Sequence, residues 1–218
     1  MSFKIKYKMD IEDNIFFAKR KLVDNIYKSA RLEGISITFA QTEDILNNVN
    51  VSSLRPDEIV AVLNLRNAWQ YIFDTLEENI DINYIKQVHT KIGSGLIYPL
   101  GEFRNCGVGI SGTNWRPKLL SEVDYYLEFK DITKNKDLLD YILNVFLWIQ
   151  RSQMFKDGNK RTANLIANHE LIKNGLGIIS IPVELLGIYK EMLVKYYETN
   201  DNIKIKQFIY DNCIDGIN

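Results

Sequence analysis

The residue types best suited to chemistry in this chain lie close together, in residues 153–164. This stretch reads Gln-Met-Phe-Lys-Asp-Gly-Asn-Lys-Arg-Thr-Ala-Asn, and Asp157-Gly158 within it is a turn dipeptide whose glycine accepts a positive φ. The residues that follow, up to Asn174, place apolar side chains at helical spacing, and Gly175 is a natural stop. The pattern predicts a tight turn that delivers the start of a helix at about Gly158 or Asn159.

The start of this predicted helix has the chemistry of an anion site. Lys160 and Arg161 fall in its first turn, where cations oppose the helix dipole. Free backbone N–H groups, the dipole and the two cations together suit a phosphate. Asp157, just before the helix, adds a carboxylate that could hold Mg²⁺ beside phosphates. Taken alone, an Asp-Gly-Asn sequence is equally explained by an ordinary turn with a helix cap.

Residues 153–164 resemble the signature loop of the Fic family, His-Pro-Phe-x-Asp/Glu-Gly-Asn-Gly/Lys-Arg-x-x-Arg, and are called the signature loop below. Gln153 stands where the family has its histidine, and Asn164 stands where many members have a second arginine. Residues 160–163 also resemble the death-on-curing branch of the family. The matching residues are Phe155, Asp157, Gly158, Asn159, Lys160 and Arg161.

The resemblance implies an enzyme that transfers AMP from ATP, with Mg²⁺, to a hydroxyl side chain of a target protein. The family's histidine acts as the base, and the amide of Gln153 does not accept a proton near pH 7. Loss of a general base typically costs about 10²–10⁴-fold, so the resemblance implies weak or altered transfer. Two alternatives stay open: an inactive Fic-fold module with a regulatory or binding role, and a phosphotransferase like the death-on-curing branch.

The resemblance also assigns roles within the signature loop. Asp157 is the expected metal ligand, and Gln153 marks the degenerate base position. The other expected catalytic residues are Asp157, Asn159 and Arg161, and the expected nucleotide contacts are Gly158, Asn159, Lys160, Arg161 and Asn164.

A second motif, Ser29-Ala-Arg-Leu-Glu33-Gly34, stands at the end of the first predicted helix. Taken bare, it is a helix that ends in an exposed acid and a glycine cap. It resembles the inhibitory motif of Fic proteins, in which the glutamate pairs with the second signature arginine in the ATP site. Because that arginine is Asn164 here, Arg161 is the remaining candidate partner for Glu33.

A third motif, Gly101-Glu-Phe-Arg104 with Val108-Gly-Ile110, resembles the family's flap. An exposed strand edge there could hold a target protein by main-chain pairing, and a surface hairpin without a partner is the alternative. Arg104 could contact phosphate or anchor the flap. The two histidines, His89 and His169, are expected to be buried and hydrogen-bonded within the core.

The predicted fold is mostly α: a Fic-type helical bundle with a small β-hairpin flap. We expect one domain, 1–218, with an N-terminal helical part (1–50), a Fic core (51–200) and a C-terminal helix (201–218). Residues 35–39 alternate like a strand but could be an extended connection, and 96–117 should form an irregular loop with the hairpin. The other predicted helices cover 10–33, 42–48, 56–78, 81–91, 121–129, 136–151, 182–197 and 202–213.

The composition limits the classes of partner and the cellular location that we expect. The chain has 218 residues with 27 basic and 28 acidic side chains, which gives no electrostatic case for nucleic acid or an anionic membrane. Its two cysteines, Cys106 and Cys213, lack metal-ligand spacing, and no signal peptide or membrane span is apparent. We therefore expect a cytoplasmic protein, which could form a homo-oligomer, with nucleotide and a target protein as its partners.

Overall fold

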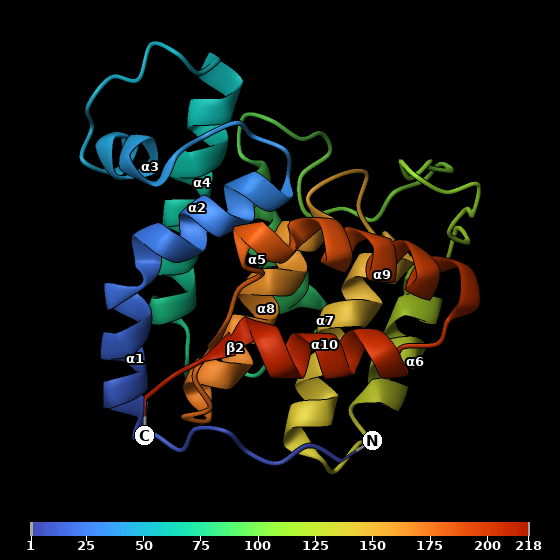
Figure 1. Ribbon diagram of the computed structural model, residues 1–218. Helices are drawn as coiled ribbons and strands as arrows, with labels where there is room; N and C mark the ends of the chain where they lie inside the picture. Colours follow the sequence, from blue (N-terminus) through green and yellow to red (C-terminus); the bar gives the residue numbers. More distant parts are fainter. Residues whose placement is uncertain (1, 218) are drawn as a thin grey trace.

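Helix α8 (Asn159–Lys173) is the centre around which the other helices pack (Figure 1). The computed structural model describes residues 2–217. Helix α8 is buried on nearly all sides, as expected for a helix without a distinct polar face. It packs against α1 (Ile11–Arg20), α4 (Pro56–Asp74), α5 (Ile82–Gly93) and α7 (Leu138–Ser152).

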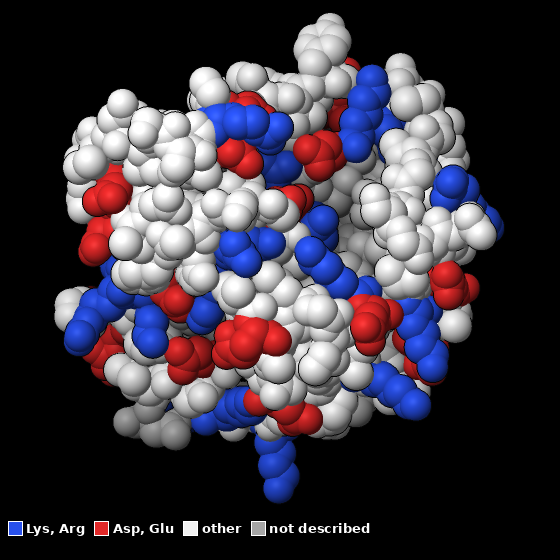
Figure 2. Space-filling view, turned by 45° about the horizontal axis from the view of Figure 1, so that its top comes forward, with Lys and Arg blue, Asp and Glu red and all other residues white. Residues whose placement is uncertain are grey.

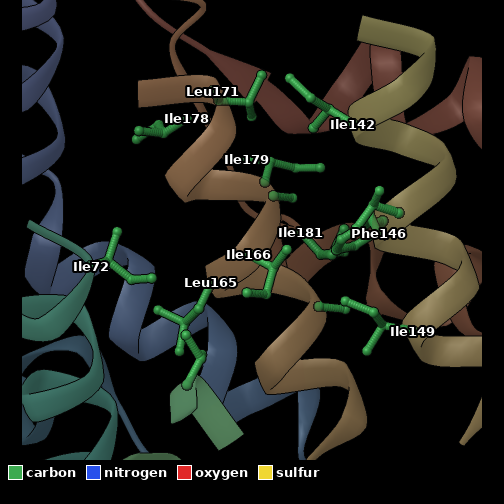
Figure 3. Packing of buried hydrophobic residues seen from close by; sticks show 14 of the residues in the cluster. Ile72, Ile142, Phe146, Ile149, Leu165, Ile166, Leu171, Ile178, Ile179 and Ile181 are labelled. Atoms are coloured by element: carbon green, nitrogen blue, oxygen red, sulfur yellow. The ribbon is translucent and has the colours of Figure 1, made fainter. Parts of the chain in front are cut away.

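The core between α7 and α8 fixes the position of the signature loop that joins them. Figure 3 shows side chains of both helices meeting isoleucines of the segment that follows α8. Burying each such side chain stabilises the fold by about 1.5–3 kcal/mol. The loop is therefore held at both ends by a well-packed core. The residues in this region include Ile142, Phe146 and Ile149 of α7, Leu165, Ile166 and Leu171 of α8, and Ile178, Ile179 and Ile181.

The N-terminal region differs from the prediction in two boundaries, and it decides the choice left open for residues 35–39. Residues 10–33 form two helices, α1 and α2 (Leu22–Leu32), which meet at Lys21, because α1 packs on α8 whereas α2 packs on the following helices. Residues 35–38 are an extended connection and not a strand. Helix α3 (Phe39–Leu46) begins earlier than expected, because Thr38 forms a capping box with Gln41.

Later helices follow the prediction more closely. Helix α4 begins at Pro56 as predicted but ends at Asp74, where the Thr75 hydroxyl turns back to the Tyr71 carbonyl at 2.7 Å. Asp81 caps α5, and Ser121 caps α6 (Glu122–Ile132). Helix α7 begins two residues later than expected, after its N-cap Asp137.

The C-terminal end of the chain lies beside α1 (Figure 1), where Lys21 Nζ is 3.5 Å from Asp215 Oδ2. The Asn14 side chain donates to the Gly177 carbonyl at 3.1 Å and accepts from the Gly177 N–H at 2.7 Å. Strands β1 (Ile178–Ile179) and β2 (Ile214–Asp215) pair antiparallel, Ile178 opposite Asp215 and Ile179 opposite Ile214. Between them lie a 3-10 turn (Val183–Leu185), α9 (Leu186–Thr199) and α10 (Ile203–Cys213).

The mostly α fold with one small β element is confirmed, but the predicted β-hairpin in the flap does not form. Within residues 2–217 the two strands are β1 and β2, and residues 96–117 form the expected irregular loop without strands. A buried side chain takes the place of a strand ladder there: Arg104 binds main-chain carbonyls on both legs of the loop, at Cys106, Pro117 and Lys118. We keep the name flap for residues 96–117. No helix within residues 2–217 has the length and apolar character needed to cross a lipid bilayer.

Candidate active site

The signature loop turns sharply between α7 and α8. Gln153 closes α7 in the left-handed conformation (φ 46°, ψ 50°), which is uncommon for a residue other than glycine. Gly158, with φ +78°, precedes α8 as its N-cap. A Cβ atom on Gly158 would lie 3.1 Å from Ile97 Cδ1 and 3.4 Å from His89 Cδ2. Both the conformation and the close packing therefore favour glycine at 158, as the turn dipeptide predicted.

Asn159 braces this loop from inside. Its side-chain oxygen accepts from the Phe155 N–H at 3.0 Å, and its amide nitrogen donates to the Phe155 carbonyl at 2.9 Å. The same nitrogen also donates to Gln153 Oε1 at 3.1 Å. The Asn159 side chain is thus occupied within the loop, and its main-chain N–H remains part of the helix start.

The two predicted cations do lie together at the start of α8, where both approach the same glutamate. Figure 2 shows a hollowed face of the molecule with Lys and Arg side chains around it. The Arg161 side chain is only 8% exposed, and its Nη2 donates to Asp157 Oδ2 at 3.1 Å. Its Nε is buried without a hydrogen-bond partner. A buried guanidinium N–H without an acceptor costs free energy, which an anionic group within hydrogen-bond distance would recover.

Glu33 reaches the same place from the end of α2. Its Oε2 lies 3.5 Å from Lys160 Nζ and its Oε1 lies 3.8 Å from Arg161 Nε. The second distance is too long for a hydrogen bond, so Oε1 and Nε attract only through their charges. The expectation that Arg161 is the partner of Glu33 agrees with this geometry, and Lys160 is a second partner that the sequence did not reveal. Ser29 is buried one turn earlier, and its carbonyl accepts from the Glu33 N–H at 3.2 Å.

Asn164 is directed elsewhere. Its amide nitrogen donates to the Ile179 carbonyl at 3.3 Å, and its oxygen accepts from Asn168 Nδ2 at 3.2 Å. These partners belong to the core and to the strand after α8. The hydrogen bonds of Asn164 therefore hold β1 to α8 and do not join it to the group formed by Asp157, Lys160, Arg161 and Glu33.

The side chain of Gln153 is engaged at both ends. Its Nε2 donates to the Gln150 carbonyl at 2.6 Å, and its Oε1 accepts from Asn159. The Tyr197 hydroxyl is also hydrogen-bonded to the Gln153 side chain. Burial raises the pKa of Tyr197 well above its ordinary value, so this phenol is no substitute for a base near neutral pH.

Arg104 anchors the flap to the signature loop and leaves the phosphate role to other residues. Its guanidinium is buried and donates from Nε to the Gln153 carbonyl at 2.6 Å, besides the carbonyls within the flap. The Arg104 N–H also donates to the Met154 carbonyl at 2.9 Å. Of the two options that the sequence left open, the structure shows the anchor. Val108 and Ile110 lie half-buried farther along the flap.

The histidines are buried and hydrogen-bonded, as predicted, but one of them lies against the site. His169 bonds to the Thr75 carbonyl and to Glu170, away from the signature loop. His89 of α5 contacts the Asp157 carbonyl at 3.1 Å and stacks on Phe155. Burial lowers the pKa of His89 to about 4. No sequence signal connected His89 to the signature loop, because the contact joins α5 to a loop that is distant in the sequence.

A recess of about 660 Å³ lies next to Ser152, the residue just before the signature loop. Its walls come from the second leg of the flap and from three helices, α6, α7 and α9. Arg151 lies over the Trp115 ring at 4.7 Å and joins the flap to α7. The recess combines aromatic, cationic and acidic side chains: Trp115, Lys118, Glu128, Trp148, Arg151 and Tyr196.

The residues at the start of α8 fit a magnesium ion that is held mainly by phosphate. Within residues 2–217 there is no group of three or more metal-ligating His, Cys, Asp or Glu side chains. Mg²⁺ commonly takes one or two protein carboxylates, keeps several waters and receives the rest from a substrate's phosphates. Asp157, whose carboxylate is 65% exposed and lies beside the anion site, can supply such a ligand.

Comparison with known proteins shows what this part of the chain resembles. Residues 79–171 match the family model described as the Fic/DOC family. Protein adenylyltransferase Fic of Drosophila melanogaster is 28% identical to this chain over 189 residues, which are 82% of this chain and 37% of that protein. The protein of the same name from Drosophila grimshawi is 26% identical over 203 residues, 88% of this chain and 41% of the relative. The chain thus spans less than half the length of these relatives.

Solved structures share the fold. Fic-1 from C. elegans superposes with a TM-score of 0.80 at 17% identity, over 95% of this chain and 64% of that one. A Fic domain containing signaling protein from Bacteroides thetaiotaomicron gives 0.69 at 20% identity, over 93% and 86% of the two chains. BepC from Bartonella tribocorum, solved with bound AMPPNP, gives 0.51 at 11% identity, over 75% and 90%. The segment that matches the Fic/DOC family model contains both the flap and the signature loop, so this part of the chain is similar to that family.

Proposed function

We propose that this chain binds ATP through its phosphates at the start of α8 and transfers AMP to a hydroxyl side chain of a target protein. The observation that carries the proposal is the buried Nε of Arg161 at the start of α8, beside Lys160: it has no hydrogen-bond partner, and the carboxylate oxygen Glu33 Oε1 stays 3.8 Å away. Phosphate oxygens accept from such donors, and the helix dipole favours their charge. The relatives named protein adenylyltransferase Fic and the AMPPNP complex of BepC support the same ligand class.

Each part of the site has a place in this proposal. The N–H groups of Gly158 and Asn159 and the cations Lys160 and Arg161 would bind the phosphates, and Asp157 would hold Mg²⁺. The ion would supply further neutralisation of phosphate charge. Asn159 would keep the loop in shape through its three side-chain hydrogen bonds. Fixed donors of this kind lower the barrier by positioning the phosphates and stabilising their charge.

The transfer itself would proceed slowly. The target oxygen attacks the α-phosphorus, the bond to pyrophosphate breaks, and the hydroxyl proton must leave. Gln153 cannot take that proton, and its side chain already bonds to Gln150 and Asn159. Solvent would take it instead, at a cost of about 10²–10⁴-fold in rate relative to a titrating base.

The flap is the proposed docking site for the target. Residues 108–110 have no strand partner, and Arg104 pins both legs of the flap beside Gln153. An extended target segment could pair with this backbone. Val108→Pro, which removes one main-chain donor, should reduce target modification while nucleotide binding stays unchanged. Equal target modification by the variant and the wild type would contradict this role.

The direct test is incubation of the protein with Mg²⁺, α-labelled ATP and a cell lysate. Label should enter protein with the wild type and disappear with Asn159→Ala, which removes the brace of the loop. γ-Labelled ATP in a parallel reaction would report phosphate transfer instead. No label in any protein, including the chain itself, would refute AMP transfer.

One observation favours a second candidate, a nucleotide-binding module without transferase activity. Both ends of the Gln153 amide form hydrogen bonds that stabilise the loop. The side chain at this position therefore has a structural role, whereas catalysis would need a base there. Gln153→His distinguishes the two candidates. New activity in a previously silent protein supports the binding module, and ready transfer by the wild type excludes it.

A further inference from the structure

His89 belongs to α5, yet it contacts both the flap and the signature loop. Its imidazole is 0% exposed and stacks on Phe155, with ring centroids 3.8 Å apart and planes inclined by 13°. The Gly101 N–H donates to Nδ1 at 3.1 Å, and Nε2 lies 3.1 Å from the Asp157 carbonyl oxygen. One side chain thus joins three segments that are far apart in the sequence.

These contacts determine which ring nitrogen carries the proton. A backbone N–H can only donate, so Nδ1 must present a lone pair to Gly101. The Asp157 carbonyl can only accept, so Nε2 must carry the hydrogen. Burial lowers the pKa of His89 to about 4, which keeps the ring neutral in this tautomer at physiological pH.

The bond to Asp157 also orients the turn before α8. In a planar trans peptide, the C=O of one residue and the N–H of the next point in opposite directions. A carbonyl of Asp157 held on His89 therefore directs the Gly158 N–H away from the imidazole. A Cβ on Gly158 would lie 3.5 Å from His89 Nε2, so the ring packs closely against this turn.

The bond to Gly101 ties the first leg of the flap to the same ring. Gly101 has φ +63°, and a Cβ there would lie 2.5 Å from Thr90 Oγ1, so its backbone is fixed against α5. Two residues later, Phe103 stacks on Phe155 with centroids 6.1 Å apart. Movement of the flap and movement of the turn are therefore coupled through His89 and Phe155.

We propose that His89 is a positioning residue for the nucleotide: its Nε2–H holds the Asp157 carbonyl so that the amides at the start of α8 face the phosphates, while its Nδ1 holds the flap. This inference rests on the proposed nucleotide binding. It predicts that the two ring nitrogens have separable effects, one on the nucleotide and one on the flap.

Two substitutions separate the nitrogens. His89→Asn places an amide oxygen near the position of Nδ1 and keeps an acceptor for Gly101, but it does not reach Asp157. His89→Gln places an amide N–H near the position of Nε2 and keeps the donor to Asp157, but it leaves the Gly101 N–H unpaired. Both variants lose the aromatic stack on Phe155, so they form a matched pair.

Calorimetry with Mg²⁺ and a non-hydrolysable ATP analogue, together with amide hydrogen exchange at Gly101, gives the test. His89→Asn should bind the analogue about three- to tenfold more weakly than His89→Gln, the effect of one hydrogen bond. Exchange at Gly101 should be faster in His89→Gln than in His89→Asn. His169→Asn, a buried histidine remote from the loop, should lower the melting temperature without changing the affinity.

The outcomes distinguish failure of the proposed nucleotide binding from failure of the proposed role of His89. A wild type that does not bind the analogue refutes the proposed function and this inference with it. Wild-type binding with equal affinities in the two His89 variants refutes only this inference. If neither variant folds, nitrogen NMR of the wild type decides: His89 should show a protonated Nε2 and an unprotonated Nδ1, and the reverse tautomer overturns the proposal.

Discussion

Removing the charge of Glu33 should tighten nucleotide binding. In the proposed complex, Glu33 would compete with phosphate for the same cations, because it lies 3.5 Å from Lys160 and 3.8 Å from Arg161. The Glu33 and Arg161 side chains are 15% and 8% exposed, so solvent screens their attraction only partly. Glu33→Gln keeps the shape of the side chain and removes the competing charge, which isolates the electrostatic contribution.

The size of the effect follows from those distances. At an effective dielectric constant of about 20, each pair attracts by roughly 4–5 kcal/mol before the cost of desolvation is counted. Desolvation offsets much of this attraction, because the charges have left water. A coupling between Glu33 and the nucleotide of about 1–3 kcal/mol remains reasonable, which is about 5–150-fold in affinity.

Calorimetry with Mg²⁺ and the ATP analogue measures this effect directly, at two salt concentrations. Glu58→Gln is the matched control. Glu58 lies in α4, its side chain is 18% exposed, and it also pairs with an arginine, Arg55. The control should leave the affinity unchanged. Binding by Glu33→Gln that is no tighter than binding by the wild type or the control would refute competition at this site.

Three further outcomes concern stability. Because the folded-state pKa of His89, about 4, lies below its ordinary value of 6.5, the unfolded chain binds the extra proton first. Urea unfolding should therefore show stability falling as pH drops from about 6.5 to 4, and His89→Gln should flatten this part of the profile. Lys206 and Asp140 form a buried ion pair at 2.7 Å, and Lys206→Met leaves the Asp140 charge without this partner. The free energy of unfolding should fall by about 3–5 kcal/mol in the same assay. A fall of less than about 1 kcal/mol would contradict the burial of the pair. Gly175→Ala would place a Cβ 2.1 Å from a main-chain oxygen at φ +68° and should lower the melting temperature, whereas Gly187→Ala meets nothing within 4 Å and should not.

The sequence predicted the parts of the fold that local chemistry determines. The turn at Asp157-Gly158, the helix after it and the caps at Asp81 and Ser121 all follow from residues within a few positions of one another. The class of fold followed from the spacing of apolar residues. These features depend on backbone conformation and on short-range hydrogen bonds, which a single segment contains.

The errors arose where distant segments decide the local structure. Residues 108–110 alternate like a strand, but Arg104 satisfies main-chain carbonyls on both legs of the flap, so no ladder is required. The break at Lys21 has no glycine or proline to mark it, since it reflects the different packing partners of the two helices. The role of His89 was invisible for the same reason: its partners lie 12 and 68 positions away.

The same division would explain how the proposed nucleotide site can persist without a titrating side chain at position 153. The proposed donors for phosphate are main-chain amides and two cations, and their positions follow from the turn, α8 and the core beneath it. The base would depend on one side chain at position 153. Gln153 retains the acceptor that Asn159 needs, at 3.1 Å, and thereby preserves the shape of the loop without a titrating group. Nucleotide affinity should therefore survive Gln153→Ala less well than Gln153→His, because alanine removes the acceptor whereas histidine can supply one. Calorimetry on the two variants checks this order, and a higher affinity in Gln153→Ala would show that the side chain at 153 has no part in holding the loop.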